Sequence, residues 1–85
     1  MSGQIELGAG SKAAILAAVD FVKQVLEVSQ EEVAVEELEF DSFRKQWLIT
    51  LSVPGSTAVP FHRRYKLLTV DATTAKVLSM KMRDV

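Results

Sequence analysis

The chain of 85 residues contains no cysteine and only one histidine, two prolines and four glycines. Without cysteine, neither a disulfide framework nor a thiolate metal site can support the small core. A single histidine excludes metal sites built from several histidines. No segment approaches the roughly 18–20 apolar residues that span a bilayer, and residues 1–10 lack the basic start and apolar run of a secretory signal. We therefore expect a cytoplasmic protein with no membrane partner.

The composition is that of a soluble globular domain, with 48% hydrophobic and 25% charged residues. A chain of this length buries only about 60–65% of its unfolded surface, which leaves room for one modest core but not for a large catalytic cleft. Three of the four glycines fall within residues 1–10, which we interpret as a flexible N-terminal arm or, through Ile5 and Leu7, a short added strand. Residues 11–85 are then a single α+β domain.

Charge is divided between the two halves of the chain. Residues 1–42 contain nine of the eleven acidic residues, and residues 43–85 contain eight of the ten basic residues. The net charge of −1 therefore conceals an acidic half and a basic half. Such a division does not specify backbone geometry, but it determines which partners a surface attracts or repels.

The segment after the arm has the spacing of an amphipathic helix. Ser11 is placed to cap a helix that runs to about Glu27, since a serine oxygen accepts a free N–H of the first turn and the alanines that follow favour helix. Its apolar face consists of Ile15, Ala18, Val19, Val22, Val25 and Leu26. Leu16 falls outside this face and should be exposed. Ser29 and Glu32 have capping-box spacing, which predicts one further helical turn.

Beyond Val33 the apolar residues recur at every second position, which is the period of a strand. Two half-buried strands are predicted, joined by the polar segment 41–46. The pairs expected on the core face are Phe40 with Trp47 and Leu38 with Ile49. Glu36 falls on the core side of this alternation, where an unpaired carboxylate is costly. We therefore expect the strand to be bent or frayed at this residue.

Residues 63–71 and 75–83 are predicted to form a second hairpin, with Val70 opposite Val77. The core face would then hold Tyr65, Leu67, Thr69, Leu78, Met80 and Met82, and the outer face Arg64, Lys66, Leu68, Ser79, Lys81 and Arg83. This register places the basic residues of the two strands beside each other, and like charges in that position destabilise a sheet. An acidic partner, or the acid-rich strand of another molecule, would relieve the repulsion.

The fold class that follows is α+β, with one N-terminal helix packed on a four-stranded antiparallel meander sheet. The layout of Ser11–Arg83, together with the turn Val70-Asp71-Ala72-Thr73-Thr74-Ala75-Lys76-Val77-Leu78 that follows Tyr65, resembles the PepSY family and its cystatin-like relatives. The resemblance implies peptidase modulation or ligand binding, and it carries over no catalytic residue. Because the family usually has glycine at the position of Ala75, we expect Ala75 to be left-handed.

His62 is the one candidate for catalysis. A Ser-His-Asp arrangement would require Ser52, Ser56 or Ser79 to approach it together with a carboxylate, and no nucleophile-elbow spacing supports this. The acidic residues of the first strand lack the spacing of a calcium loop. We therefore expect no enzymatic activity, no cofactor and no metal site.

The leading hypothesis is a small non-enzymatic protein-binding module, of the inhibitor or immunity type, that acts through a charged sheet face or an edge strand. The expected partner-binding residues are Arg64, Lys66, Lys81, Arg83, Glu37, Glu39 and Asp41. Nucleic acid is not the expected partner, because the face lacks stacking aromatics and its acidic strand repels phosphate.

The alternatives are a small-ligand or nucleic-acid-binding accessory protein, and a small hydrolase that uses His62. A twofold dimer through the last strand would bring Lys81 and Arg83 near their own copies. Because exposed like charges oppose such a pairing, we expect a monomer or weak self-association.

Overall fold

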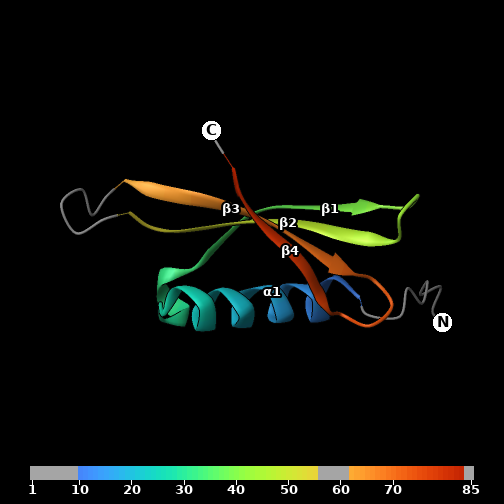
Figure 1. Ribbon diagram of the computed structural model, residues 1–85, viewed down its shortest axis with the longest axis horizontal. Helices are drawn as coiled ribbons and strands as arrows, with labels where there is room; N and C mark the ends of the chain where they lie inside the picture. Colours follow the sequence, from blue (N-terminus) through green and yellow to red (C-terminus); the bar gives the residue numbers. More distant parts are fainter. Residues whose placement is uncertain (1–9, 56–61, 84–85) are drawn as a thin grey trace.

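The computed structural model describes residues 10–55 and 62–83. Its elements are helix α1 (Ser11–Leu26), the 3-10 turn η1 (Gln30–Glu32), and strands β1 (Ala34–Asp41), β2 (Gln46–Pro54), β3 (Arg63–Asp71) and β4 (Val77–Arg83). The strands form one antiparallel sheet in the order β1-β2-β3-β4, and α1 lies along one face of it (Figure 1). The predicted α+β architecture is therefore confirmed. The predicted arm lies outside the described residues, except for Gly10.

The face of α1 that meets the sheet is made of small residues. Ala14, Ala18 and Val22 recur every four positions and are fully buried, so the helix backbone lies close to the sheet. The buried strand residues of the same core are Ile49, Leu51, Val53, Leu68 and Val70. The predicted apolar face omitted Ala14, and it was wrong for Val25, whose side chain is 50% exposed. Leu16 is exposed, as predicted.

Backbone groups close both ends of α1. Gly10 is the N-cap, and its carbonyl accepts a hydrogen bond from the N–H of Ala14 at 3.0 Å. Ser11 is the first helical residue and makes no capping bond, so the predicted cap was wrong by one residue. At the other end Glu27 adopts the left-handed conformation (φ 56°), which ends the helix.

The first hairpin has the predicted register. Its core-facing pairs are Phe40 with Trp47 and Leu38 with Ile49. The register shifts at Glu36, which forms a bulge in β1. The Glu36 carboxylate accepts a hydrogen bond from the hydroxyl of Ser52 at 2.7 Å. The expected bend at this acid is confirmed, and the bulge spares the strand an unpaired carboxylate in the core.

The second hairpin contains a bulge that was not predicted. Val70 lies opposite Val77, as expected, but the next pair joins Thr69 to Ser79. Leu78 therefore has no partner in β3 and forms the bulge. Every later residue of β4 is shifted by one position relative to β3. The uniform register expected from alternation was wrong beyond this point.

With this bulge, the faces of β3 are the reverse of those predicted, whereas the residues of β4 from Ser79 onward lie on their predicted faces. Leu78 was predicted in the core, and this was wrong, since it is the bulged residue and is exposed. The helix side of β3 carries Lys66, Leu68 and Val70, all of them buried, and its outer side carries Tyr65, Leu67 and Thr69. In β4, Lys81 and Arg83 face outward as predicted. Lys66 is opposite Met82 rather than Lys81, so the expected contact between like charges does not form.

The two hairpin turns share one device. The carboxylates of Asp41 and Asp71 each accept hydrogen bonds from the backbone N–H groups two and three residues later. Four residues after each aspartate stands a left-handed residue, Lys45 (φ 56°) and Ala75 (φ 63°). The conformation of Ala75 was predicted, and that of Lys45 was not. Hydrogen bonds from the backbone N–H of Thr74 and of the residue before it lower the pKa of Asp71.

Candidate functional site

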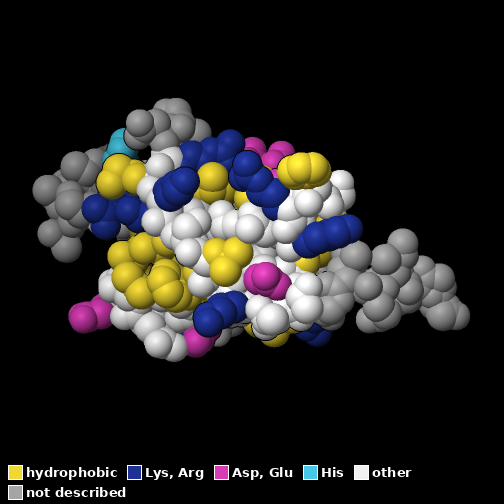
Figure 2. Space-filling view, turned by 45° about the vertical axis from the view of Figure 1, so that its right-hand side comes forward, with side chains coloured by type: hydrophobic (Ala, Val, Ile, Leu, Met, Phe, Trp, Pro, Cys, Tyr) yellow, Lys and Arg dark blue, Asp and Glu magenta, His cyan; other side chains and the backbone are white. Residues whose placement is uncertain are grey.

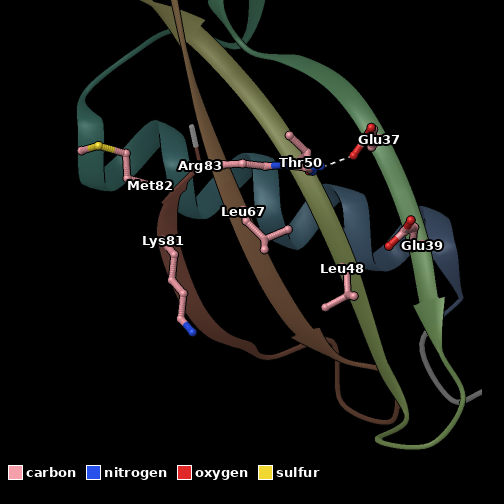
Figure 3. A pocket seen from close by; sticks show the side chains of 8 residues that line it. All are labelled: Glu37, Glu39, Leu48, Thr50, Leu67, Lys81, Met82 and Arg83. Atoms are coloured by element: carbon pink, nitrogen blue, oxygen red, sulfur yellow. Dashed lines mark hydrogen bonds and ion pairs between the residues drawn. The ribbon is translucent and has the colours of Figure 1, made fainter. Parts of the chain in front are cut away.

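The outer face of the sheet, opposite α1, brings together four of the predicted partner-binding residues. β1 contributes Glu37 and Glu39, β4 contributes Lys81 and Arg83, and between them lie Leu48, Thr50 and Leu67. Figure 3 shows these side chains around a hollow of about 320 Å³, and it shows Met82 pointing away from it. Acidic side chains thus form one wall of the hollow, basic side chains form the other, and the floor is largely apolar.

Arg83 crosses this face from one edge strand to the other. Its guanidinium donates to the carboxylate of Glu37 at 2.6 Å and to the hydroxyl of Thr50, so a side chain that starts on β4 ends on β1 (Figure 3). The twist of the sheet carries β4 obliquely across the other strands, which shortens this reach (Figure 1). Thr50 has no helix above it, yet it is only 3% exposed. Arg83 therefore acts as a cover for the centre of the outer face.

The Arg83–Glu37 pair divides the outer face into two hollows. A second hollow of about 250 Å³ lies beyond the pair, toward Glu36 and Tyr65. The side chains of Arg83 and Glu37 are 40% and 54% exposed. An ion pair with that exposure contributes at most about 1 kcal/mol. A partner that supplies its own charges can therefore replace the pair at little cost.

A second arginine covers Ser52, the other buried polar residue of β2. Arg63 donates to the hydroxyl of Ser52 at 2.9 and 3.1 Å and to its carbonyl at 2.9 Å. The same guanidinium reaches the carbonyl of Glu32 in η1 at 3.1 Å. The predicted capping box holds this turn, since the N–H of Ser29 donates to the Glu32 carboxylate at 2.8 Å. Arg63 thus ties η1 to the sheet.

Three predicted partner-binding residues do not line the hollow. Arg64 and Lys66 lie on the helix side of β3, and Lys66 is only 8% exposed. Their predicted place on the outer face was wrong, because the bulge in β4 shifts the register. Asp41 belongs to the outer side of β1, but its carboxylate is held by the backbone N–H groups of the first turn. The site is therefore smaller than predicted.

Sequence reasoning missed Leu67 as part of the floor, since a uniform register placed it in the core. The signal that points to the shift is a pair of adjacent apolar residues, Val77 and Leu78, at the start of β4. In a strand with one buried face, two neighbours cannot both point inward unless one of them leaves the ladder.

His62 is exposed immediately before β3. Among the serines considered as its nucleophile, Ser52 donates to Glu36, Ser79 is half-buried within β4, and Ser56 lies outside the described residues. Within residues 10–55 and 62–83, no three side chains of the types that bind metals are grouped to hold an ion. Nothing in this region adds support for the hydrolase alternative.

Comparisons of the chain with protein-family models, with curated proteins and with solved structures found no match. The resemblance to the PepSY family therefore stays a prediction that rests on layout and on the last turn. In the part of the chain that the structure describes, no helix is long and apolar enough to cross a membrane. The geometry of the outer face is the basis on which a function can be argued.

Proposed function

We propose that this chain is a protein-binding module that inhibits or neutralises another protein, and that it binds its partner through the outer face of the sheet. The observation that carries the proposal is the two-signed hollow, with Glu37 and Glu39 on one wall and Lys81 and Arg83 on the other. A surface that carries both charges in a set arrangement attracts a partner with the opposite arrangement and rejects others.

The hollow indicates the chemistry of the partner segment. An apolar side chain would lie over Leu48 and Leu67, with a basic group toward Glu39 and an acidic group toward Lys81. Among residues 10–55 and 62–83, neither Glu39 nor Lys81 has an ion-pair partner. Figure 2 shows Lys and Arg side chains gathered along the upper part of the molecule, with acidic side chains visible behind them. The charges of Glu39 and Lys81 are therefore available to a partner.

A small ligand suits this surface less well. The hollow has about 320 Å³, at the low end of the roughly 300–1,000 Å³ typical of small-molecule pockets, but such pockets bury most of the ligand, whereas this hollow is open to solvent. Nucleic acid is disfavoured because the acidic wall repels phosphate. A protein segment with mixed charge satisfies both walls.

Site-specific photocrosslinking in cells that produce the protein tests the proposal. A photoreactive amino acid in place of Leu67, on the floor of the hollow, should capture one protein partner. The same amino acid in place of Val25, which is exposed on α1, is the matched control and should capture none. Capture through position 25 in preference to position 67 would show that the partner binds elsewhere.

The captured partner then allows a kinetic test. Lys81→Glu should slow its association by about tenfold at low salt, because electrostatic steering acts mainly on the association rate. Arg64→Glu reverses an exposed charge on the other side of the sheet and should leave the rate unchanged. Equal rates for the wild type and Lys81→Glu would contradict the role of the charged walls.

A further inference from the structure

Within residues 10–55 and 62–83, β1 and β4 are the unpaired edges of the sheet, and the two edges complement each other. The β1 edge has Glu37 and Glu39 on the outer side and Val35 and Leu38 on the helix side. The β4 edge has Lys81 and Arg83 on the outer side and Met80 and Met82 on the helix side. One edge is therefore acidic outside and apolar inside, and the other is basic outside and apolar inside.

The apolar side of β1 is left uncovered by the helix. α1 packs mainly on β2, β3 and β4. Between α1 and β1 lies a groove of about 490 Å³ with Ile15, Leu16, Val19, Val33 and Val35 as its apolar lining. Val35 and Leu38 of β1 are 45% and 38% exposed. A strand added at this edge would cover both residues.

We propose that the added strand is β4 of a second copy of this chain, so that copies associate head to tail. In a four-stranded meander the first and last strands run in opposite directions. A second copy in the same orientation therefore presents its β4 antiparallel to β1, which is the pairing already used throughout the sheet. The helices of both copies then lie on the same side.

A single register matches both sides of the new pair. With Glu39 opposite Lys81 of the second copy, Leu38 lies opposite Met82 of that copy. The outer pair joins opposite charges, and the inner pair joins two apolar side chains, both of which favour a cross-strand contact. The register brings Glu37 opposite Arg83 of the second copy in the same way.

Contacts between like edges are opposed by charge. Two β1 edges would bring carboxylates together, and two β4 edges would bring Lys81 and Arg83 near their own copies. Head-to-tail contact leaves one free edge at each end, so it builds rings or open chains rather than a closed twofold dimer. Because Arg83 already pairs with Glu37 within one copy, the contact between copies rests mainly on Glu39, Lys81 and the apolar side. We expect a weak association that salt weakens further.

Sedimentation of the purified chain, from about 10 μM to about 1 mM, measures this association. The average mass should rise with concentration in about 20 mM salt and fall back in about 300 mM. Glu39→Lys and Lys81→Glu, each alone, should raise the dissociation constant by about tenfold, since each variant sets like charges opposite each other. An equal mixture of the two variants should regain the association, because every contact between unlike copies then pairs opposite charges.

Two further variants control for net charge. Glu31→Lys and Lys12→Glu change the charge by the same amounts at exposed positions outside both edges, and they should associate like the wild type. Circular dichroism confirms that each variant is folded. The proposal is overturned if the wild type stays monomeric up to the highest concentration, if neither edge variant weakens association, or if mixing them restores nothing. Capture through position 67 tests the partner site separately, since Leu67 lies on an inner strand.

Discussion

The two faces of the sheet are buried by different means. On the helix side, α1 lays Ala14, Ala18 and Val22 against apolar strand residues, and all of these side chains are excluded from water. None of the described residues forms a helix on the outer side, yet Thr50 and Ser52 are also buried. Their cover consists of the side chains of Arg83 and Arg63.

The hydrophobic contacts of α1 and the arginine side chains on the outer face differ in the free energy that their removal costs. Removal of α1 from the sheet would expose apolar surface to water at about 25 cal/mol per Å². Removal of the Arg83 cover exposes one threonine and returns two half-exposed charges to solvent, which costs little. The outer face can therefore meet a partner without unfolding the domain, whereas the strand residues beneath α1 cannot.

The largest expected effect on stability comes from replacing a leucine by alanine, and it should differ between the two faces of the sheet. Leu51→Ala on the helix side should lower the free energy of unfolding by about 3 kcal/mol, because Leu51 is fully buried and leaves a cavity. Leu48→Ala on the outer face should cost only about 1 kcal/mol, because Leu48 is partly exposed. Urea denaturation measures both. Equal losses would mean that the outer face is packed as tightly as the core.

The next effect tests whether an arginine cover stabilises the fold. Arg63→Ala should lower the free energy of unfolding by about 1.5 kcal/mol, because the carbonyls of Ser52 and Glu32 lose a charged donor. Arg64→Ala is the neighbouring control, exposed and outside this network, and should change it by less than about 0.5 kcal/mol. Thermal unfolding compares the two. A loss that is no larger for Arg63 than for Arg64 would show that the cover is dispensable.

A smaller effect concerns the turn that leads into β4 and hence to the outer face. Ala75→Gly should raise the free energy of unfolding by about 0.5 kcal/mol, because relief of the left-handed strain exceeds the extra entropy of glycine in the unfolded chain. Ala72→Gly in the same turn is the control and should lower it by about 0.5–1 kcal/mol, since Ala72 is buried and not left-handed. Destabilisation by Ala75→Gly in chemical denaturation would refute the strain argument.

The smallest expected effect concerns the ion pair between Arg83 and Glu37 across the outer face. Glu37→Gln should lower the free energy of unfolding by about 0.3–0.5 kcal/mol in about 20 mM salt, and by nothing measurable in about 500 mM. Glu39→Gln is the control, since Glu39 has no ion pair among residues 10–55 and 62–83. Chemical denaturation at both salt concentrations measures the free energy of unfolding of the two variants. A loss for Glu37→Gln that persists at high salt would mean that its hydrogen bonds, and not its charge, hold Arg83.

Much of the site was predictable because alternation assigns side chains to faces. The outward positions of Glu37, Glu39, Lys81 and Arg83 followed from period two and from the two hairpins. The positions of Arg64 and Lys66 did not, because the bulged residue in β4 changes which residues of β3 and β4 lie opposite each other. A pattern of period two has no means of signalling such a shift, apart from the adjacent Val77 and Leu78.

The sequence by itself determined the elements, their order and the register of the first hairpin, because these depend on local periodicity. Only the tertiary structure decided that α1 lies away from β1, that Leu67 joins the floor of the hollow, and that Arg83 reaches Glu37. These features depend on sheet twist, on the bulge at Leu78 and on how small residues seat the helix. They arise from contacts between distant segments, which no local pattern encodes.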